Sequence, residues 1–269
     1  MCGYTLNPII NITTITLIIL GGIGFVVLFD LIRLRGNKKR KGLKFLSLHS
    51  KIALSLTAFL ILFGTAFIFI FEYNNPETVG EHSLFQKIQF AIFQSVTTRT
   101  AGFATVPQEN LTNGSAFVSL ILMFIGGSPV GTAGGIKTVT VAVLLFSALA
   151  TIRNQNETEM FNRTVSKNAV RKAVAVFSMS FIILLCSTLL LSLVCDATAI
   201  DILYETVSAT ATVGLTRSLT PSLNLWGKLI IIATMYFGRV GPISLAFAFS
   251  TRKENRNIIK NPTEEISVG

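Results

Sequence analysis

The chain has 269 residues, of which 51% are apolar and 13% are charged, and its mean hydropathy is +0.63. This balance excludes an ordinary soluble domain and is typical of an all-α integral membrane protein. The net charge of +10 would suggest a nucleic-acid partner in a soluble protein, but the charges fall between the apolar runs, so we expect a membrane and no nucleic acid.

Apolar runs of spanning length come first in chain order, and each can cross a hydrocarbon core of ~30 Å. The segment that follows the first run, residues 33–51, holds eight lysines and arginines and no acidic residue, which predicts that it faces the cytoplasm. The loop after the third run and the C-terminal tail are also basic, so the C-terminus is expected in the cytoplasm. The five runs are Ile12–Ile32, Ile52–Phe71, Ala116–Ala150, Ala173–Val194 and Leu225–Phe249.

Two shorter apolar segments, near Ser83–Val96 and Ala199–Ala211, follow the second and the fourth runs. Each gives roughly 20 Å of helix, which is too short to span, so each must enter the membrane and turn back. A stretch with the order Thr, small or apolar residue, Gly, apolar residue follows each of them, and the two copies lie 112 positions apart. The two stretches are Thr100, Ala101, Gly102, Phe103 and Thr212, Val213, Gly214, Leu215.

This repeat favours a pore-loop plan that binds a cation. A half-helix that ends near the middle of the membrane directs its negative C-terminal dipole at an ion, and glycine lets the carbonyls that follow point into a narrow path. Threonine hydroxyls at 100 and 212 can add oxygen ligands. We therefore expect a monovalent cation at the filter carbonyls of these eight residues and no other metal site; re-entrant turns in a carrier remain the alternative.

The third run would make a helix of ~50 Å, so something must interrupt it. The interruption is a run of small residues with a proline, at Gly126, Gly127, Ser128, Pro129, Val130, Gly131, Thr132, Ala133, Gly134 and Gly135. Arg239 is expected in the middle of the fifth spanning helix, where an unpaired cation is costly. It would donate hydrogen bonds to the loop at 126–135 or raise a barrier to cations, and both make it a gate element. The alternatives are a snorkelling or structurally paired arginine and a loop that serves only helix packing.

The first run is expected to start outside with nothing before it, which indicates a fragment whose upstream part is absent. The features above also predict how the chain is divided into repeats and loops. The expected units are an outgoing transmembrane helix of a preceding repeat at 1–35, a basic cytoplasmic loop at 36–51, a pore-loop repeat with the gating loop at 52–152, a cytoplasmic loop at 153–172, a second pore-loop repeat at 173–253 and a cytoplasmic tail at 254–269.

The strings TTRTAGF, GGSPVGTAGG, TVGLT and FGRVGP resemble the third and fourth repeats of the Ktr/Trk/HKT potassium-transporter superfamily, and the KtrB branch in particular. The resemblance covers nearly the whole chain, with Ile19–Phe25 similar to the outgoing helix of the second repeat. It implies a single pore built from four linked repeats, with Gly102 and Gly214 as filter glycines, residues 126–135 as the intramembrane gating loop and Arg239 as the arginine that faces this loop.

The same resemblance implies potassium uptake across the plasma membrane, with Na⁺ as an activator. It also implies a membrane homodimer that sits on a cytoplasmic nucleotide-binding ring like KtrA. The residues alone do not decide between potassium and sodium, because oxygen cages of this kind can be tuned to either ion.

Three other functions compete with this one. A complete two-pore-loop subunit acting as a dimer would be expected to extend each glycine motif with an aromatic residue and a second glycine, and neither copy does so. A secondary carrier, such as a Na⁺/K⁺ symporter with alternating access, would also use broken helices. An enzyme is not expected, and neither is a covalently bound cofactor, because the sequence has no activated nucleophile, paired acids or metal spacing.

Overall fold

The computed structural model describes residues 2–5, 7–36 and 45–241. Three segments lie outside the described residues: the expected cytoplasmic tail at 254–269, the part of the fifth run after residue 241, and residues 37–44 of the basic loop expected at 36–51. In the described part the chain is mostly helical and has almost no sheet, which confirms the all-α class.

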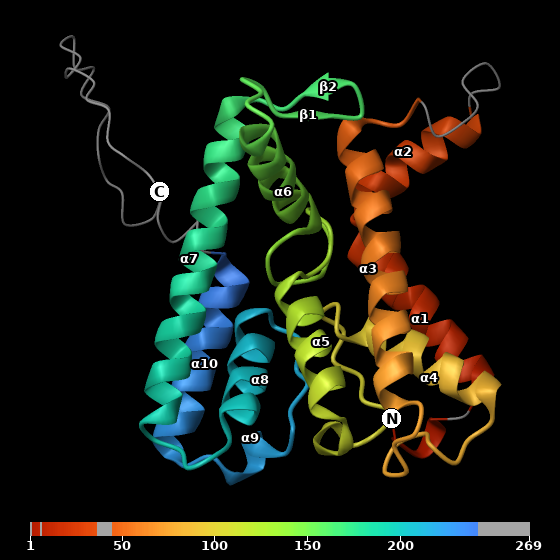
Figure 1. Cartoon of the computed structure of the whole chain (residues 1–269), viewed down its shortest axis with the longest axis vertical. Helices are drawn as coiled ribbons and strands as arrows, with labels where there is room; N and C mark the ends of the chain where they lie inside the picture. The colour runs from red at the N-terminus through yellow and green to blue at the C-terminus, as the bar shows by residue number, and fades with distance from the viewer. Residues whose placement is uncertain (1, 6, 37–44, 242–269) are drawn as a thin grey trace.

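Among the described residues, two single helices are long and apolar enough to cross a membrane, α3 (Leu48–Glu72) and α7 (Lys167–Ser192). A serine hydroxyl caps the first turn of each: Ser47 accepts a hydrogen bond from the backbone N–H of Ser50, and Ser166 accepts one from that of Ala169. Both helices run along the long axis of the molecule on opposite sides of it (Figure 1).

The first apolar run is not one straight span. It forms α1 (Pro8–Ile23) and α2 (Phe25–Gly36), which meet at an angle of 96°. The expectation of a single outgoing helix therefore needs correction. Gly24 lies at the break with φ +86°, a conformation that favours glycine, and a Cβ on it would lie 2.4 Å from the carbonyl oxygen of Pro129. The bend thus follows from a close backbone contact with a segment more than a hundred residues later.

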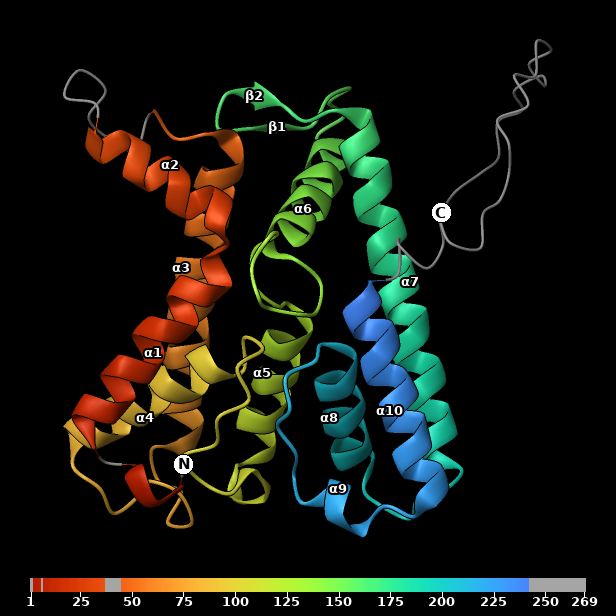
Figure 2. The same ribbon diagram turned by 180° about the vertical axis from the view of Figure 1, so that it is seen from behind.

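The expected short helices are both present, as α4 (Leu84–Thr97) and α8 (Ala199–Thr210). Figure 1 and Figure 2 show them at the same end of the molecule, on either side of α5 (Asn113–Phe124). A buried core joins α5 to α8, with Met123 packed in the same cluster as Tyr204 and Val207. The two repeats therefore lie side by side.

The third run is split into α5 and α6 (Thr138–Ile152), and the fifth run forms α10 (Leu225–Val240). Short elements complete the described chain: the 3₁₀ turns η1 (Cys2–Tyr4) and η3 (Gln108–Asn110), the helical turn α9 (Leu219–Ser222), and a small antiparallel hairpin of β1 (Glu159–Met160) and β2 (Arg163–Thr164). The hairpin, which the sequence patterns do not predict, lies at the end opposite to α4 and α8.

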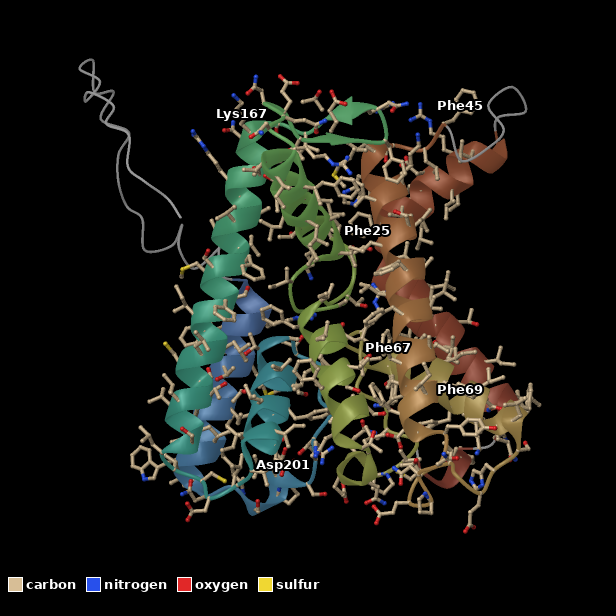
Figure 3. All side chains as sticks on the ribbon, viewed as in Figure 1. Phe25, Phe45, Phe67, Phe69, Lys167 and Asp201 are labelled. Carbon is tan, nitrogen blue, oxygen red and sulfur yellow. The ribbon has the colours of Figure 1, made fainter. Side chains whose placement is uncertain are left out.

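Figure 3 shows Lys167 at the end that carries the hairpin and Asp201 at the end that carries the short helices. The described loop at 153–166, which is expected to be cytoplasmic, therefore lies at the opposite end from the acidic loop that precedes α8.

Candidate functional site

The two predicted filter segments have the same backbone conformation. Thr100 and Thr212 have φ of +67° and +55°, and Gly102 and Gly214 have φ of +76° and +92°. A positive φ is uncommon for a residue with a side chain, so its presence at both threonines is a specific feature. The repeat that was recognised from residue types therefore extends to the backbone angles.

The two segments are in direct contact. A Cβ placed on Gly102 would lie 2.1 Å from the carbonyl oxygen of Val213 and 3.5 Å from Cα of Gly214. Gly214 itself has open space at the corresponding position, with no neighbouring atom within 4 Å. Glycine is thus required at 102 both by its φ and by the contact, and at 214 by its φ.

Threonine oxygens are available at the place where the ion ligands were predicted. In the described part of the chain, Oγ1 of Thr100 and Oγ1 of Thr212 are buried and have no hydrogen-bond partner. A buried polar atom without a partner is costly, and a dehydrated cation is one ligand that would satisfy it. Within the same described ranges, no group of three or more His, Cys, Asp or Glu side chains could hold a metal ion, so the oxygens of these loops are the donors to consider.

Two side chains that were not predicted as site residues form hydrogen bonds that stabilise the turns of the filter segments. Oγ1 of Thr97 donates to the carbonyl oxygen of Phe103 at 2.7 Å and accepts from its N–H at 2.8 Å. In the second copy, Oγ of Ser208 accepts from the N–H of Gly214 at 3.1 Å. The Phe103 carbonyl, which was expected among the ion ligands, is therefore already bonded to Thr97. Thr97 and Ser208 are polar residues in the last turns of the two short helices, and this pattern could have identified them from the sequence.

The predicted interruption between α5 and α6 is a loop folded back on itself midway along the molecule (Figure 1). Ile125 and Ile136 form a parallel bridge, and the hydroxyls of Ser128 and Thr138 are 3.1 Å apart. A Cβ on Gly126 would lie 2.0 Å from the carbonyl oxygen of Gly134. The small residues therefore allow the two limbs of the loop to touch through their backbones.

The loop fills the space between the bend of α1 and α2 and the second filter segment. On one side, the N–H of Ser128 donates to the carbonyl of Gly22 at 2.8 Å, and that of Thr132 donates to the carbonyl of Gly21 at 3.3 Å. On the other side, a Cβ on Gly134 would lie 2.0 Å from Oγ1 of Thr212. The loop is thus packed directly against a predicted ion ligand.

Three cationic side chains hold carbonyls of this loop. Arg239 Nη1 donates to the carbonyl oxygen of Thr132 at 3.0 Å, and Lys137 Nζ donates to that of Ala133. Arg99 Nη2, which is buried, donates to the carbonyl oxygen of Gly126 at 3.4 Å. The contact of Arg239 agrees with the first of its two expected roles, whereas Arg99 and Lys137 were missed although both interrupt apolar or small-residue stretches.

The position of Arg239 differs from the expected one. It lies in the last turn of α10, which ends at Val240 in the described part of the chain, and not in the middle of the described helix. Gly241 follows with φ +85°, a conformation in which an α-helix does not continue. Arg239 therefore lies at a helix end beside the loop, where its guanidinium donates to the carbonyl oxygen of Thr132.

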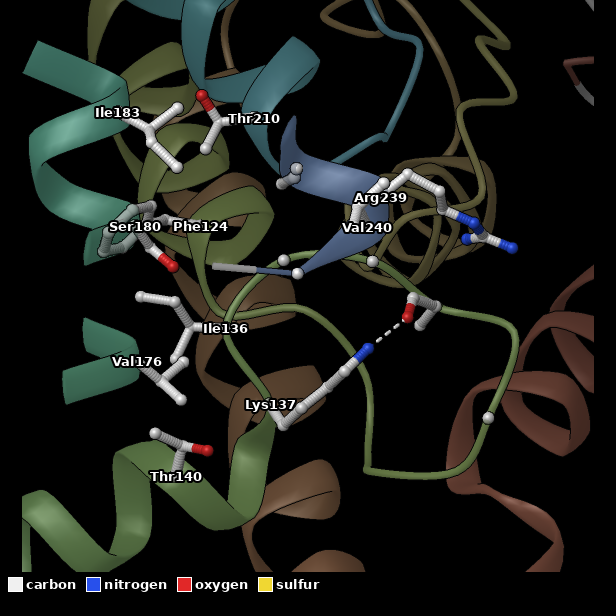
Figure 4. A pocket seen from close by; sticks show the side chains of 17 residues that line it. Phe124, Ile136, Lys137, Thr140, Val176, Ser180, Ile183, Thr210, Arg239 and Val240 are labelled. Atoms are coloured by element: carbon white, nitrogen blue, oxygen red, sulfur yellow. Dashed lines mark hydrogen bonds between the residues drawn. The ribbon is translucent and has the colours of Figure 1, made fainter. Parts of the chain in front are cut away.

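A cavity of about 350 Å³ adjoins the loop, and Figure 4 shows Lys137 reaching from its wall to the loop carbonyl. The C-terminal end of α8 opens onto this cavity through Thr210 and Ala211, so the negative end of the helix dipole faces it. The other residues of its wall come from the loop and from α5, α6, α7 and α10, including Gly134, Ser180, Ile183, Gly238 and Arg239.

Comparison with known proteins identifies the family of this chain. The model of a family described as "TrkH: Cation transport protein" matches residues 1–260. The chain belongs to the TrkH family. Its members are transport proteins and not enzymes, which confirms the expectation made from the lack of catalytic groupings, and they are membrane proteins.

The relatives of this TrkH-family chain include the "Ktr system potassium uptake protein B" of Bacillus subtilis, 38% identical over all 269 residues, and the protein of the same name from Vibrio alginolyticus, 36% identical over the same length. The "Potassium/sodium uptake protein NtpJ" of Enterococcus hirae is 35% identical over 94% of the chain. The chain spans 59%, 58% and 56% of the lengths of these three relatives, respectively.

The fold is also that of a solved structure of the family. The crystal structure of the potassium transporter TrkH from Vibrio parahaemolyticus matches with a TM-score of 0.73 and 16% sequence identity, over 91% of this chain and 53% of that one. The predicted resemblance to the Ktr/Trk superfamily is therefore confirmed.

Proposed function

We propose that this chain contributes two pore-loop repeats to a path for potassium uptake across the cell membrane. The observation that carries the proposal is the contact between the two Thr–Gly segments, which share left-handed backbone angles at both positions. Non-helical backbone at this depth is tolerated where it is enclosed by protein or lines a water-filled path. Two such loops in contact, with unpartnered threonine oxygens among the described residues, fit an ion path better than a lipid-facing turn.

The residues in the filter role are Thr100, Ala101, Gly102, Thr212, Val213, Gly214 and Leu215, whose carbonyls and hydroxyls replace the water shell of the ion. Phe103 has a supporting role, since its carbonyl is bonded to Thr97. The choice of potassium follows from the names of the relatives, two of which are potassium uptake proteins. Sodium as an activator is a further part of the proposal.

The loop at 126–135 is the gate in this proposal, and Arg239 holds it closed. The packing of Gly134 against Thr212 puts the loop where it would block an ion that leaves the second filter segment. The hydrogen bond from Arg239 to the carbonyl oxygen of Thr132 fixes the loop at a second point. Opening then requires the loop to leave Thr212, and loss of the Arg239 contact favours this movement.

The assembly follows the family pattern in this proposal. Residues 52–152 and 173–253 are the two repeats, each repeat has its basic flanking segment in the cytoplasm, and the C-terminus is cytoplasmic. The other half of the pore comes from two further repeats. The pore subunit is a homodimer that rests on a cytoplasmic nucleotide-binding ring.

Rubidium flux tests the proposal. The full product of the gene is purified and reconstituted into liposomes, and uptake of external ⁸⁶Rb⁺ is measured, with protein-free liposomes as the control. We expect K⁺ to compete with ⁸⁶Rb⁺ at a lower concentration than Na⁺ does. Equal competition by the two ions would contradict a potassium filter, and uptake with a fixed number of Na⁺ ions per Rb⁺ would indicate a secondary carrier instead.

A further inference from the structure

The side chain of Gln108, just after the first filter segment, is bonded to both short helices. Its Oε1 accepts from Nε2 of Gln94 in α4 at 2.6 Å and from the hydroxyl of Tyr204 in α8 at 3.0 Å. The exposed fractions of Gln94, Gln108 and Tyr204 are 0%, 2% and 0%. One amide oxygen therefore joins the two repeats at a fully buried point.

A second residue of the later repeat holds the same segment by its backbone. Arg217 Nη1 donates to the carbonyl oxygens of Gln108 at 3.3 Å and Leu111 at 3.2 Å, and its Nη2 donates to that of Glu109 at 3.4 Å. Its Nε is paired with Oδ1 of Asp201 in α8 at 2.8 Å. The planar guanidinium is thus fixed by α8 while it binds three carbonyls of the earlier repeat.

Each repeat also binds its own post-filter segment. Gln94 does so through Gln108 in the first repeat, and Glu205 of α8 does so in the second, where it accepts from the hydroxyl of Thr216 at 2.7 Å and from that of Thr220. Tyr204 and Arg217 differ from these residues because their hydrogen bonds cross from one repeat to the other. They are therefore placed to set how the two filter segments lie relative to each other.

We propose that Gln108, Tyr204 and Arg217 form a clamp that fixes the spacing of the two filter segments and thereby sets ion selectivity. The inference rests on the proposed function. The three act as positioning residues, since the ion path itself is lined by the segments at 100–103 and 212–215. The contact of Gly102 with Val213 means that a small displacement of one repeat changes the distance between opposing carbonyls. Discrimination between K⁺ and Na⁺ depends on the size and the field of this oxygen cage.

The test uses Tyr204→Phe, which removes one hydrogen bond and no packing volume. The full gene product is reconstituted, and the Na⁺ and K⁺ concentrations that halve ⁸⁶Rb⁺ uptake are measured with the maximal rate. We expect the Na⁺-to-K⁺ ratio of these concentrations to fall, by at most about fivefold, the factor that a single net hydrogen bond is worth when all of it distinguishes the two ions. Tyr236→Phe is the matched control, because Tyr236 is 62% exposed on α10, and its ratio should be that of the wild type.

Gln89→Leu is a second control, for a buried amide in the same helix as Gln94. Gln89 is 8% exposed, and both polar atoms of its side chain lack a hydrogen-bond partner in the described part of the chain. Its replacement should leave the ratio unchanged, which separates loss of the clamp from loss of any buried polar group close to the filter.

The outcomes separate the clamp from the function on which it rests. If the wild type does not discriminate between the ions, the proposed potassium filter is wrong. If the wild type discriminates and Tyr204→Phe changes only the maximal rate, the clamp is refuted. If Tyr204→Phe yields no folded protein, Arg217→Lys carries the test, because a lysine keeps the charge beside Asp201 and loses the three-carbonyl contact; an unchanged ratio in that variant would also refute the clamp.

Discussion

Replacing Gly102 with alanine should damage the protein more than the same change at Gly214. At both sites a side chain in the left-handed region costs about 1–2 kcal/mol. At Gly102 the new Cβ would also lie 2.1 Å from the Val213 carbonyl oxygen, and the backbone of a filter segment would have to move, which adds about 1–3 kcal/mol by analogy with overpacked cores. At Gly214 no atom lies within 4 Å, so the strain stands alone.

Thermal unfolding of the purified variants in detergent measures this difference, with the fraction of protein that elutes without aggregation as a second readout. We expect the midpoint to fall further for Gly102→Ala than for Gly214→Ala, and ⁸⁶Rb⁺ uptake to be lost in the first variant before it is lost in the second. Equal midpoints for the two variants would refute the reasoning, because they would mean that Gly102 does not touch the second filter segment.

Three further predictions concern ion choice, gating and the support of the first filter turn. Gly214→Ser should lower selectivity for K⁺ over Na⁺ in ⁸⁶Rb⁺ competition, because the serine restricts the angles that orient the carbonyls; unchanged preference would remove Gly214 from the filter. Arg239→Ala should raise the rate of uptake without altering ion preference, since it frees the Thr132 carbonyl, whereas reduced flux with intact folding would indicate a structural arginine. Thr97→Val should weaken apparent K⁺ affinity, because the N–H of Phe103 in this partly buried turn loses its acceptor at a cost of about 1 kcal/mol, and wild-type affinity would contradict this role.

The sequence was sufficient to predict the elements with strong local signals. The short helices α4 and α8 are bounded by changes from apolar to small residues and were expected within one residue of their observed ends. The break between α5 and α6 follows from glycines and a proline in an apolar run, which no continuous helix accommodates.

Features that depend on distant contacts were not predictable in the same way. The bend at Gly24 arises from the approach of Pro129, and nothing local distinguishes Gly24 from a glycine that serves helix packing. The positive φ at Thr100 and Thr212 is a property of the folded turn and not of threonine, which rarely adopts it alone. The contacts of Arg99 and Lys137 with loop carbonyls required the loop geometry, since each residue by itself is only a cation in an apolar context.

The same limit applies to the place of Arg239 within its helix. It was expected in the middle of a spanning helix because it lies within an apolar run, but Gly241, two residues later, has φ +85°, so Arg239 lies at the end of α10. A glycine in an apolar run is compatible both with helix packing and with a helix end. Only the position of Thr132, the loop residue that Arg239 contacts, distinguishes the two.

The binding position of a heavy potassium analogue shows whether the two Thr–Gly segments together form an ion site. Crystals of the full gene product grown in RbCl, with anomalous data collected at the rubidium edge, would locate the ion. We expect a peak between the segments at 100–103 and 212–215, within coordinating distance of their peptide oxygens and of the hydroxyls of Thr100 and Thr212. A peak elsewhere with this site empty, or the two segments found apart and facing lipid, would contradict it.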